Sequence, residues 1–403
     1  MKIPELLKRK KFWVAIIIVI TIMLVFSQAS FTVCWITSIV SPEHPCYCSV
    51  NVEKDRVTII VSKGGIYDTD DVASSVSKYF TSVKKDLNIE NAGLKKFPGK
   101  TIDELDKFVD DLYMDDNVAY IILIGDDLPT ASGVNATNWE SLAAIYWKME
   151  CVDEDCGCCR CSDIAISSIM PPFAYTDPEK VSFILKTMET YTDYHNNFES
   201  YMKKYPRTAL HLTDYEGSEN GKYIGLADPK EGLGYDMPQE YVYNTEYQKV
   251  TDKLKKKHLA MHFSIHGDDT TGRDMSLSII GKQQLERLGG PAFLSAKHTQ
   301  PYWSTIDEYL EFARENGAPA LFMSGFSCGD LIIKSPMNRT DYCCWPQAFM
   351  DTGTWAYYAG FGTNSEGKRM NKAFSNEQTI GLAVRKYRAQ QNLIFGDILA
   401  HMK

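Results

Sequence analysis

The sequence predicts an α/β protein with a mostly parallel sheet flanked by helices. From residue 56 onward, continuous apolar and β-branched runs of strand length alternate with amphipathic, charged segments of helix length. Strands that are buried on both faces have such continuous apolar runs, and parallel neighbours need long, usually helical, connections. A long uncharged segment precedes this domain and predicts one further helix outside it.

That N-terminal segment predicts a membrane anchor. Residues 12–42 contain no charged side chain and follow a basic stretch. On a helix, Trp13 and Trp35 would lie roughly 33 Å apart, close to the spacing of the two membrane interfaces where tryptophan concentrates. We therefore expect a transmembrane signal anchor over residues 12–40.

The flanking charges predict the topology. The basic residues of 1–11 place that end in the cytosol, so a linker over 41–55 and a domain over 56–403 would be extracytosolic. A cleaved signal peptide with Ala29 near the cleavage point is the alternative, and the protein would then be secreted.

The charge balance argues against nucleic acid as a partner. After residue 11 the chain has 38 Lys and Arg against 51 Asp and Glu, a formal charge of −13. An acidic domain repels phosphate backbones, so we expect no nucleic-acid binding.

Eleven cysteines in an extracytosolic chain predict disulfides. Five of them fall in "CVDEDCGCCRC", residues 151–161, within a predicted insertion at about 136–162. A zinc site is the alternative, but the spacing contains no paired Cys-x-x-Cys knuckles, so the pattern favours a disulfide-stapled insertion.

The individual elements follow from these patterns. Strands are predicted at 56–62, 118–125, 163–169, 207–213, 259–265, 320–326 and 354–362. Helices are predicted at 70–86, 102–114, 178–196, 240–257, 304–316, 345–351 and 374–392. The turn-rich stretch 214–238 predicts a long loop.

The stretch "FMSGFSCGDL", residues 322–331, offers two nucleophiles, Ser327 and Cys328. A nucleophilic serine in an elbow of this kind needs a histidine that follows it in the sequence. His401 is the histidine that follows Ser327, and it is a poor base because it lies close to the C-terminus, where chains commonly fray. A cysteine is less demanding because its thiol is partly ionised near neutrality. His266, just after a predicted strand, would serve it at the carboxyl edge of the sheet, so the pattern favours Cys328.

Histidines at 258, 262 and 266 raise a competing zinc hypothesis, because this spacing places all three on one face of a helix. The intervening "LAMHFSI" instead predicts a buried strand, on which residues 262 and 266 lie about 13 Å apart. A structural role for His262 is the expectation.

The order "FSIHGD" and then "FMSGFSCGDL" resembles the clan of caspase-like cysteine peptidases, and in detail the gingipain family. The segments "YIILIGDDLP", "SDIAISSI", "QAFMDTGTWAYYAGFGTN" and "LIFGDILAHM" resemble further parts of that family, so the likeness extends over roughly 56–403. It departs at Ser168, where the family has an arginine, and in the Cys-rich insertion.

The resemblance implies an endopeptidase with a caspase-like fold. Cys328 would attack the scissile carbonyl, His266 would manage the proton of the leaving amine, and the backbone N–H groups of Gly267 and Cys328 would form the oxyanion hole. Glu216 matches the acidic residue that orients the histidine, and Asp228 lies near the residue that selects a basic side chain before the cut. The chemistry requires no cofactor.

The resemblance also implies a structural calcium ion, with Asp126 as one ligand in its Gly-Asp-Asp turn. The partners would be a protein or peptide substrate and the membrane. A non-catalytic receptor or adaptor on a peptidase-like fold, and a serine hydrolase that acts through Ser327, are the rival functions.

Overall fold

The computed structural model describes most of the chain after residue 53. The described residues are 54–132, 145, 146, 148–152, 162–172, 175–213, 215–219, 222–225, 234–243, 252–264, 267, 268, 276, 277, 306–326, 345–360, 364–387 and 392–403. By its internal contacts the chain divides into Met1–Tyr47 and Cys48–Lys403, and all described residues belong to the second unit. The anchor predicted at 12–40 therefore lies outside them. Among the helices that are described, none has both the length and the apolar character that crossing a membrane requires.

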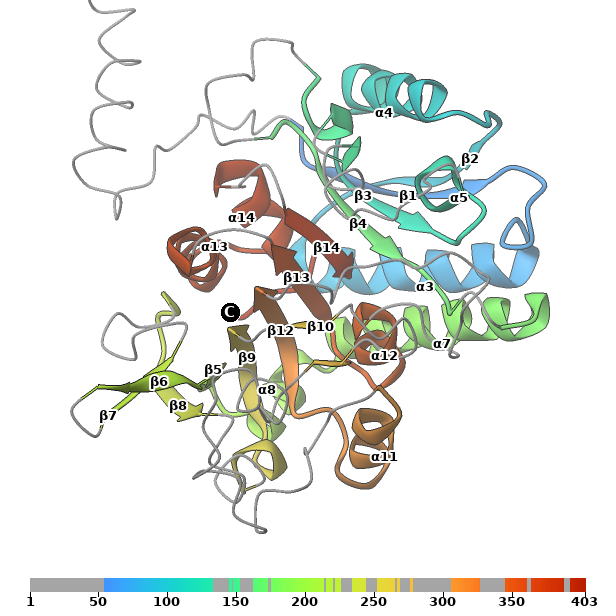
Figure 1. Ribbon diagram of the computed structural model, residues 1–403. Coiled ribbons are helices and arrows are strands. Elements are labelled where there is room, and N and C mark those ends of the chain that lie inside the picture. Colours follow the sequence, from blue (N-terminus) through green and yellow to red (C-terminus); the bar gives the residue numbers. More distant parts are fainter. Residues whose placement is uncertain are drawn as a thin grey trace, which may run out of the picture. The chain divides into compact units, whose positions relative to one another are not determined.

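Ten strands of the described part form one sheet (Figure 1). In spatial order they are β2 (Asn91–Phe97), β1 (Arg56–Ser62), β3 (Val118–Ile124), β4 (Ala165–Ile169), β14 (Asn392–Gly396), β13 (Ala356–Gly360), β12 (Ala320–Phe326), β9 (His258–Ser264), β5 (Ala209–Thr213) and β8 (Gln239–Tyr243). β3 is buried along its whole length, which explains its uninterrupted apolar sequence.

Every neighbouring pair in this sheet is parallel except β13 and β14. The sheet therefore has a first half, β2-β1-β3-β4-β14, and a second half, β13-β12-β9-β5-β8, whose strands run in opposite directions. As a result, the carboxyl ends of the strands in the two halves point in opposite directions. We call the two borders of the sheet at which strands begin and end its edges, and the carboxyl ends of the two halves lie at opposite edges. The prediction of a mostly parallel sheet is confirmed, and its division into two opposed halves was not predicted.

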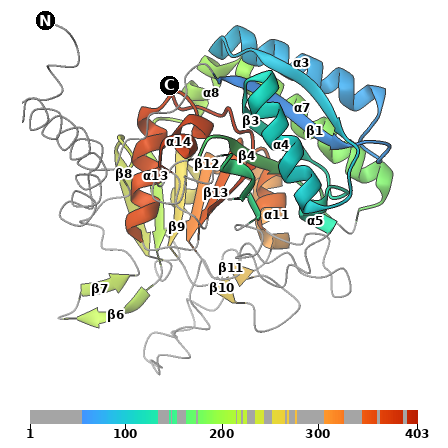
Figure 2. The same ribbon diagram turned by 90° about the horizontal axis from the view of Figure 1, so that it is seen from above.

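Helices cover both faces of the sheet (Figure 2). They are α3 (Asp70–Leu87), α4 (Ile102–Asp116), α5 (Pro129–Ser132), α7 (Asp177–Asn196), α8 (Phe198–Lys204), α11 (Ile306–Asn316), α12 (Trp345–Asp351), α13 (Asn364–Asn376) and α14 (Ile380–Tyr387). The connections β1-α3-β2 and β2-α4-β3 step in opposite directions along the sheet, so right-handed crossovers place α3 and α4 on opposite faces. Figure 1 shows α4 above these strands and α3, packed against α7, below them.

Local signals position these helices. Thr101 caps α4, because its hydroxyl accepts a hydrogen bond from the Glu104 N–H while the Glu104 carboxylate accepts one from the Thr101 N–H. The helix ends at Asn117, which adopts the left-handed conformation with φ 58°. Asn88 ends α3 in the same way, so two asparagines stop two helices just before a strand.

Two predicted helices differ from the structure. The first residues of the helix predicted at 240–257 form most of the edge strand β8, whose "YVY" consists of the aromatic and β-branched residues that favour strands. The helix predicted at 374–392 is instead the end of α13, all of α14 and the start of β14. The interruption has a local cause, since the Thr379 hydroxyl accepts a hydrogen bond from the Leu382 N–H and so begins a new helix.

Two short antiparallel ribbons lie in the connections of the second half. β6 (Tyr215–Glu219) pairs with β7 (Lys222–Gly225) in the connection that follows β5. β10 (Gly267–Asp268) pairs with β11 (Ser276–Leu277) in the connection that follows β9. The loop predicted at 214–238 therefore includes a hairpin.

Candidate functional site

Three neighbouring strands of the second half, β5, β9 and β12, have their last residues paired with one another. Parallel pairing places Thr213 of β5 opposite Ser264 of β9, and Ser264 opposite Phe326 of β12. Ligands of open parallel sheets bind beyond such carboxyl ends. In the sequence, His266 and Cys328 each stand two residues beyond this level on the adjacent strands β9 and β12.

The predicted site residues themselves lie largely outside the described residues. This holds for Cys328, His266, Asp228 and Ser327. The backbone of Gly267 belongs to β10 and that of Glu216 to β6, in the connections that follow β9 and β5.

A row of polar side chains crosses the second half just before this edge, and we call it the polar row. In-register pairing aligns Tyr241, His211, His262, Ser324 and Tyr358 across β8, β5, β9, β12 and β13. His262 Nδ1 lies 2.6 Å from Ser324 Oγ, and the rings of His211 and His262 are 5.2 Å apart in an edge-to-face arrangement. The polar row lies two residues before the last paired positions of β9 and β12, Ser264 and Phe326.

This geometry confirms the structural role predicted for His262. The residue is buried, hydrogen-bonded and located on β9, which also contains His258. A strand cannot place residues 258, 262 and 266 together as a helix face would, so the helical zinc alternative is wrong.

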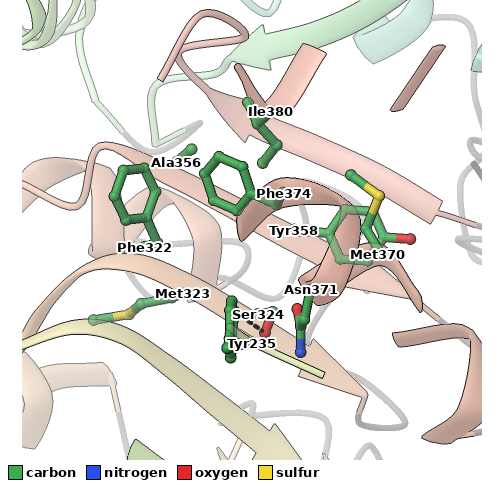
Figure 3. A pocket seen from close by; sticks show the side chains of 10 residues that line it. All are labelled: Tyr235, Phe322, Met323, Ser324, Ala356, Tyr358, Met370, Asn371, Phe374 and Ile380. Carbon is green, nitrogen blue, oxygen red and sulfur yellow. Dashed lines mark hydrogen bonds between the residues drawn. The ribbon is translucent and has the colours of Figure 1, made fainter. Parts of the chain in front are cut away.

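A small cavity adjoins the polar row between the sheet and α13 (Figure 3). Its walls are mainly apolar, with Phe322 and Phe374 on one side, and Ser324 and Asn371 supply polar atoms. The Tyr235 hydroxyl lies 3.2 Å from Ser324 Oγ. Burial raises the pKa of Tyr235, so this phenol stays protonated and the cavity lining carries no charged side chain among the described residues.

Asp126 lies at the opposite edge of the sheet, at the carboxyl end of the first half. Its Oδ1 accepts a hydrogen bond from the Tyr67 hydroxyl at 2.6 Å, and its Oδ2 pairs with Lys180 Nζ at 2.6 Å. Both carboxylate oxygens of Asp126 therefore have protein partners among the described residues, and calcium binding there stays a prediction. Beside them, burial and the charge of Asp126 raise the pKa of Asp127 to about 6.

A buried cluster that the sequence did not predict lies at this same edge. Asp86 Oδ2 is 2.7 Å from His195 Nδ1 and 2.8 Å from His401 Nε2, while His195 Nε2 is 2.9 Å from Asp397 Oδ2. Burial alone would lower the pKa of His195, but Asp397 and Asp86 raise it to about 9. Burial opposes ionisation of Asp86, yet the two imidazoles hold its pKa at about 2.

The position of His401 corrects one expectation. Instead of fraying, the residue is buried and follows β14, whose last residue Gly396 pairs with Ala356 at the start of β13. Ser327 follows the other end of β12, beyond Phe326. A seven-residue strand spans roughly 20 Å, so His401 is too distant to act as a base for Ser327.

Ser168 and the cysteines were also singled out in the sequence. Ser168 is buried on β4, where its hydroxyl bonds that of Tyr146, so it lies in the core of the first half. Of the cysteines, the described part contains the half-buried Cys151. The remaining cysteines, and any disulfide among them, lie outside it.

Comparisons with known proteins agree with this architecture. No family model matches the chain, and no curated protein matches it. A solved structure described as "Structure of Protease" superimposes with a TM-score of 0.53 over 87% of this chain and 79% of that one, at 11% sequence identity. At this identity the likeness shows the fold alone, a mixed α/β fold with a mostly parallel sheet flanked by helices.

Proposed function

We propose that the protein is a cysteine endopeptidase of the caspase-like clan, similar to gingipains, with Cys328 as the nucleophile and His266 as its partner. The observation that carries the proposal is the common level at which β9 and β12 end. Ser264 of β9 pairs with Phe326 of β12. His266 and Cys328 each follow their paired residue by two positions in the sequence, so both come just beyond the same end of the sheet. The fold-level likeness to a protease adds support.

The chemistry of such a site needs four groups. The Cys328 thiolate attacks the scissile carbonyl carbon, and the N–H groups of Gly267 and Cys328 stabilise the oxyanion that forms. When the intermediate collapses, the C–N bond breaks and the protonated His266 gives its proton to the leaving amine. Water then attacks the thioester, the acid product leaves and the thiol is restored.

One further residue would orient the catalytic histidine, and another would select the substrate. Glu216, in the ribbon that follows β5, would accept a hydrogen bond from His266 and hold its ring. Asp228 would pair with an arginine or lysine before the cut, which gives a basic specificity. The N-terminal segment would anchor the domain to a membrane with its active site on the extracytosolic side.

Covalent labelling of the full chain tests the proposal. We expect an acyloxymethyl ketone peptide with Arg or Lys at its first position to alkylate Cys328, as mass spectrometry of the labelled peptide would show. Cys328→Ala should abolish labelling, and His266→Ala should slow it by about 10²-fold. Ser327→Ala is the matched control at the adjacent position and should leave the rate unchanged.

The alternatives give different results. Loss of labelling in Ser327→Ala with retention in Cys328→Ala would establish a serine nucleophile. Labelling by a probe with Asp or Asn instead of Arg or Lys would keep the dyad and remove the role of Asp228. No labelling by any of these probes, in a chain whose circular dichroism is that of a folded α/β protein, would favour the non-catalytic receptor.

A further inference from the structure

We propose that Asp86, His195 and His401 bind a divalent metal ion, and that zinc is the ion that fits best. The three side chains come from parts of the chain that are far apart, at the end of α3, near the end of α7 and after β14. Their ligand atoms, Asp86 Oδ2, His195 Nδ1 and His401 Nε2, lie within 4.8 Å of one another. Two imidazole nitrogens and one carboxylate oxygen are a common zinc donor set.

The distances are close to those of a zinc site. The carboxylate oxygen is 2.7 and 2.8 Å from the two nitrogens. In a tetrahedral site with bonds of about 2.0 to 2.1 Å, ligand atoms lie roughly 3.3 Å apart. An outward movement of the Asp86 carboxylate by about half an ångström would bring both oxygen–nitrogen distances to this value.

Each imidazole already has the outer partner that metal-bound histidines have. His195 Nε2 is 2.9 Å from Asp397 Oδ2, and His401 Nδ1 is 2.6 Å from the backbone oxygen of Lys403. A carboxylate or carbonyl at the far nitrogen fixes the tautomer and directs the other nitrogen to the metal. Asp397 is itself held by the Trp355 indole N–H at 2.8 Å and the Tyr79 hydroxyl at 2.6 Å.

The charge of the cluster matches a divalent cation. Asp86 and Asp397 carry two negative charges in an environment where His195 and Asp397 have no exposed side-chain surface. With neutral imidazoles, one divalent ion makes the buried cluster neutral, which avoids the cost of isolated buried charge. The Asp86 side chain, 14% exposed, gives the ion a path to the ligands.

A metal here would join α3 and α7 to the segment after β14. This site lies at the edge of the sheet opposite to the proposed dyad, so it does not depend on the peptidase activity. Its role would be structural, since it ties together residues that are 109 and 315 positions apart in the sequence.

Cobalt binding to the full chain tests the site. After removal of metals with a chelator, Co²⁺ should bind with visible bands typical of four-coordinate cobalt, and Zn²⁺ should displace it. The site is next to Trp355, whose ring centroid is 5.1 Å from that of His195 and 5.2 Å from that of His401. Bound Co²⁺ should therefore quench tryptophan emission, and Trp355→Phe should reduce that quenching.

Two ligand variants and one control identify the residues. Asp86→Asn and His401→Gln keep the approximate shape of each side chain and should each weaken Co²⁺ affinity by more than about 10-fold. Asp193→Asn is the matched control, because Asp193 lies on α7 beside His195 but bonds Asn197 and Tyr201 instead. It should leave the affinity unchanged.

Three results would overturn the proposal. One is the absence of visible cobalt bands in a folded, chelator-treated chain, which would identify the cluster as a metal-free hydrogen-bonded network. Another is equal Co²⁺ affinity in the wild type and both ligand variants. The third is a sulfur-to-cobalt charge-transfer band, which would place the ion on the cysteines of residues 151–161 instead.

Discussion

At the scale of single residues, two adjacent aspartates at the end of β3 have different surroundings. Asp126 pairs with Lys180 and accepts a hydrogen bond from Tyr67, whereas the carboxylate oxygens of Asp127 have little solvent access and no side-chain hydrogen bond among the described residues. Burial and the neighbouring Asp126 raise the pKa of Asp127 from 3.8 to about 6. The folded protein therefore holds this proton more tightly than the unfolded chain does.

Asp127→Asn should stabilise the protein at neutral pH. Because the folded-state pKa is raised, wild-type stability should fall as pH rises from about 4 to about 6 and stay lower above that range. After allowance for solvent screening of this partly exposed residue, the gain at pH 7 should be about 1 kcal/mol. Denaturant unfolding of wild type and variant at pH 4 and pH 7 measures it.

The exposed Asp71→Asn on α3 is the matched control and should change stability little at either pH. A gain for Asp127→Asn that is as large at pH 4 as at pH 7 would contradict the assignment, since the carboxyl of the folded protein is already protonated at pH 4.

At the scale of elements, the end of β14 depends on a glycine. Gly396 has φ 96°, and a Cβ atom there would lie 2.6 Å from the Trp355 backbone oxygen and 2.9 Å from the Tyr191 hydroxyl oxygen. The chain turns at this point into the segment that carries Asp397 and His401. A residue with a side chain can adopt neither the conformation nor the close approach without cost.

Gly396→Ala should destabilise the protein by about 1 to 3 kcal/mol or more, because it adds a steric clash to backbone strain. Gly93→Ala is the matched control. Gly93 also has a positive φ, 83°, within β2, but a Cβ atom there would meet no described atom within 4 Å. We expect the control to have a smaller effect in denaturant unfolding. Equal losses would show that strain alone, and not the contact with Trp355, sets the cost.

At the scale of the whole described unit, the two opposed halves of the sheet are joined directly. β13 and β14 pair over five residues at the junction. α7 packs against α3 and is linked to the second half by the ion pair of Lys186 with Asp351 at 2.8 Å. A continuous sheet with shared helices should unfold as one cooperative unit.

Leu321→Ala tests this cooperativity. Leu321 is fully buried on β12, in the second half, and its truncation should cost about 2 to 5 kcal/mol. Under conditions where exchange follows global unfolding, hydrogen exchange should accelerate in β1 and β3 of the first half as well as in β12. Met114→Ala, at a side chain that is 62% exposed, is the control and should change neither half. Faster exchange confined to the second half would show that the halves unfold independently.

The parts of the fold that the sequence predicted are those with strong local signals. β1 and β12 have the predicted bounds and α12 begins and ends where predicted, because apolar runs and helical periodicity are local properties. β2 was missed because "NAGLKKF" is half-exposed at the edge of the sheet and lacks an apolar run. β14 was also missed: its first residue, Asn392, ends the helix predicted at 374–392, and its short apolar stretch follows directly on that helical pattern.

For the candidate site, too, some features could be predicted from the sequence and others could not. The sequence by itself determined which residues could form a dyad, because His266 and Cys328 each follow a predicted strand and resemble known motifs. Tertiary structure alone decided that β9 and β12 are neighbours that end at one level, and that His401 lies at the opposite edge. It also brought Asp86, His195 and His401 together, since pairing between distant segments depends on strand order and direction, which no local pattern contains.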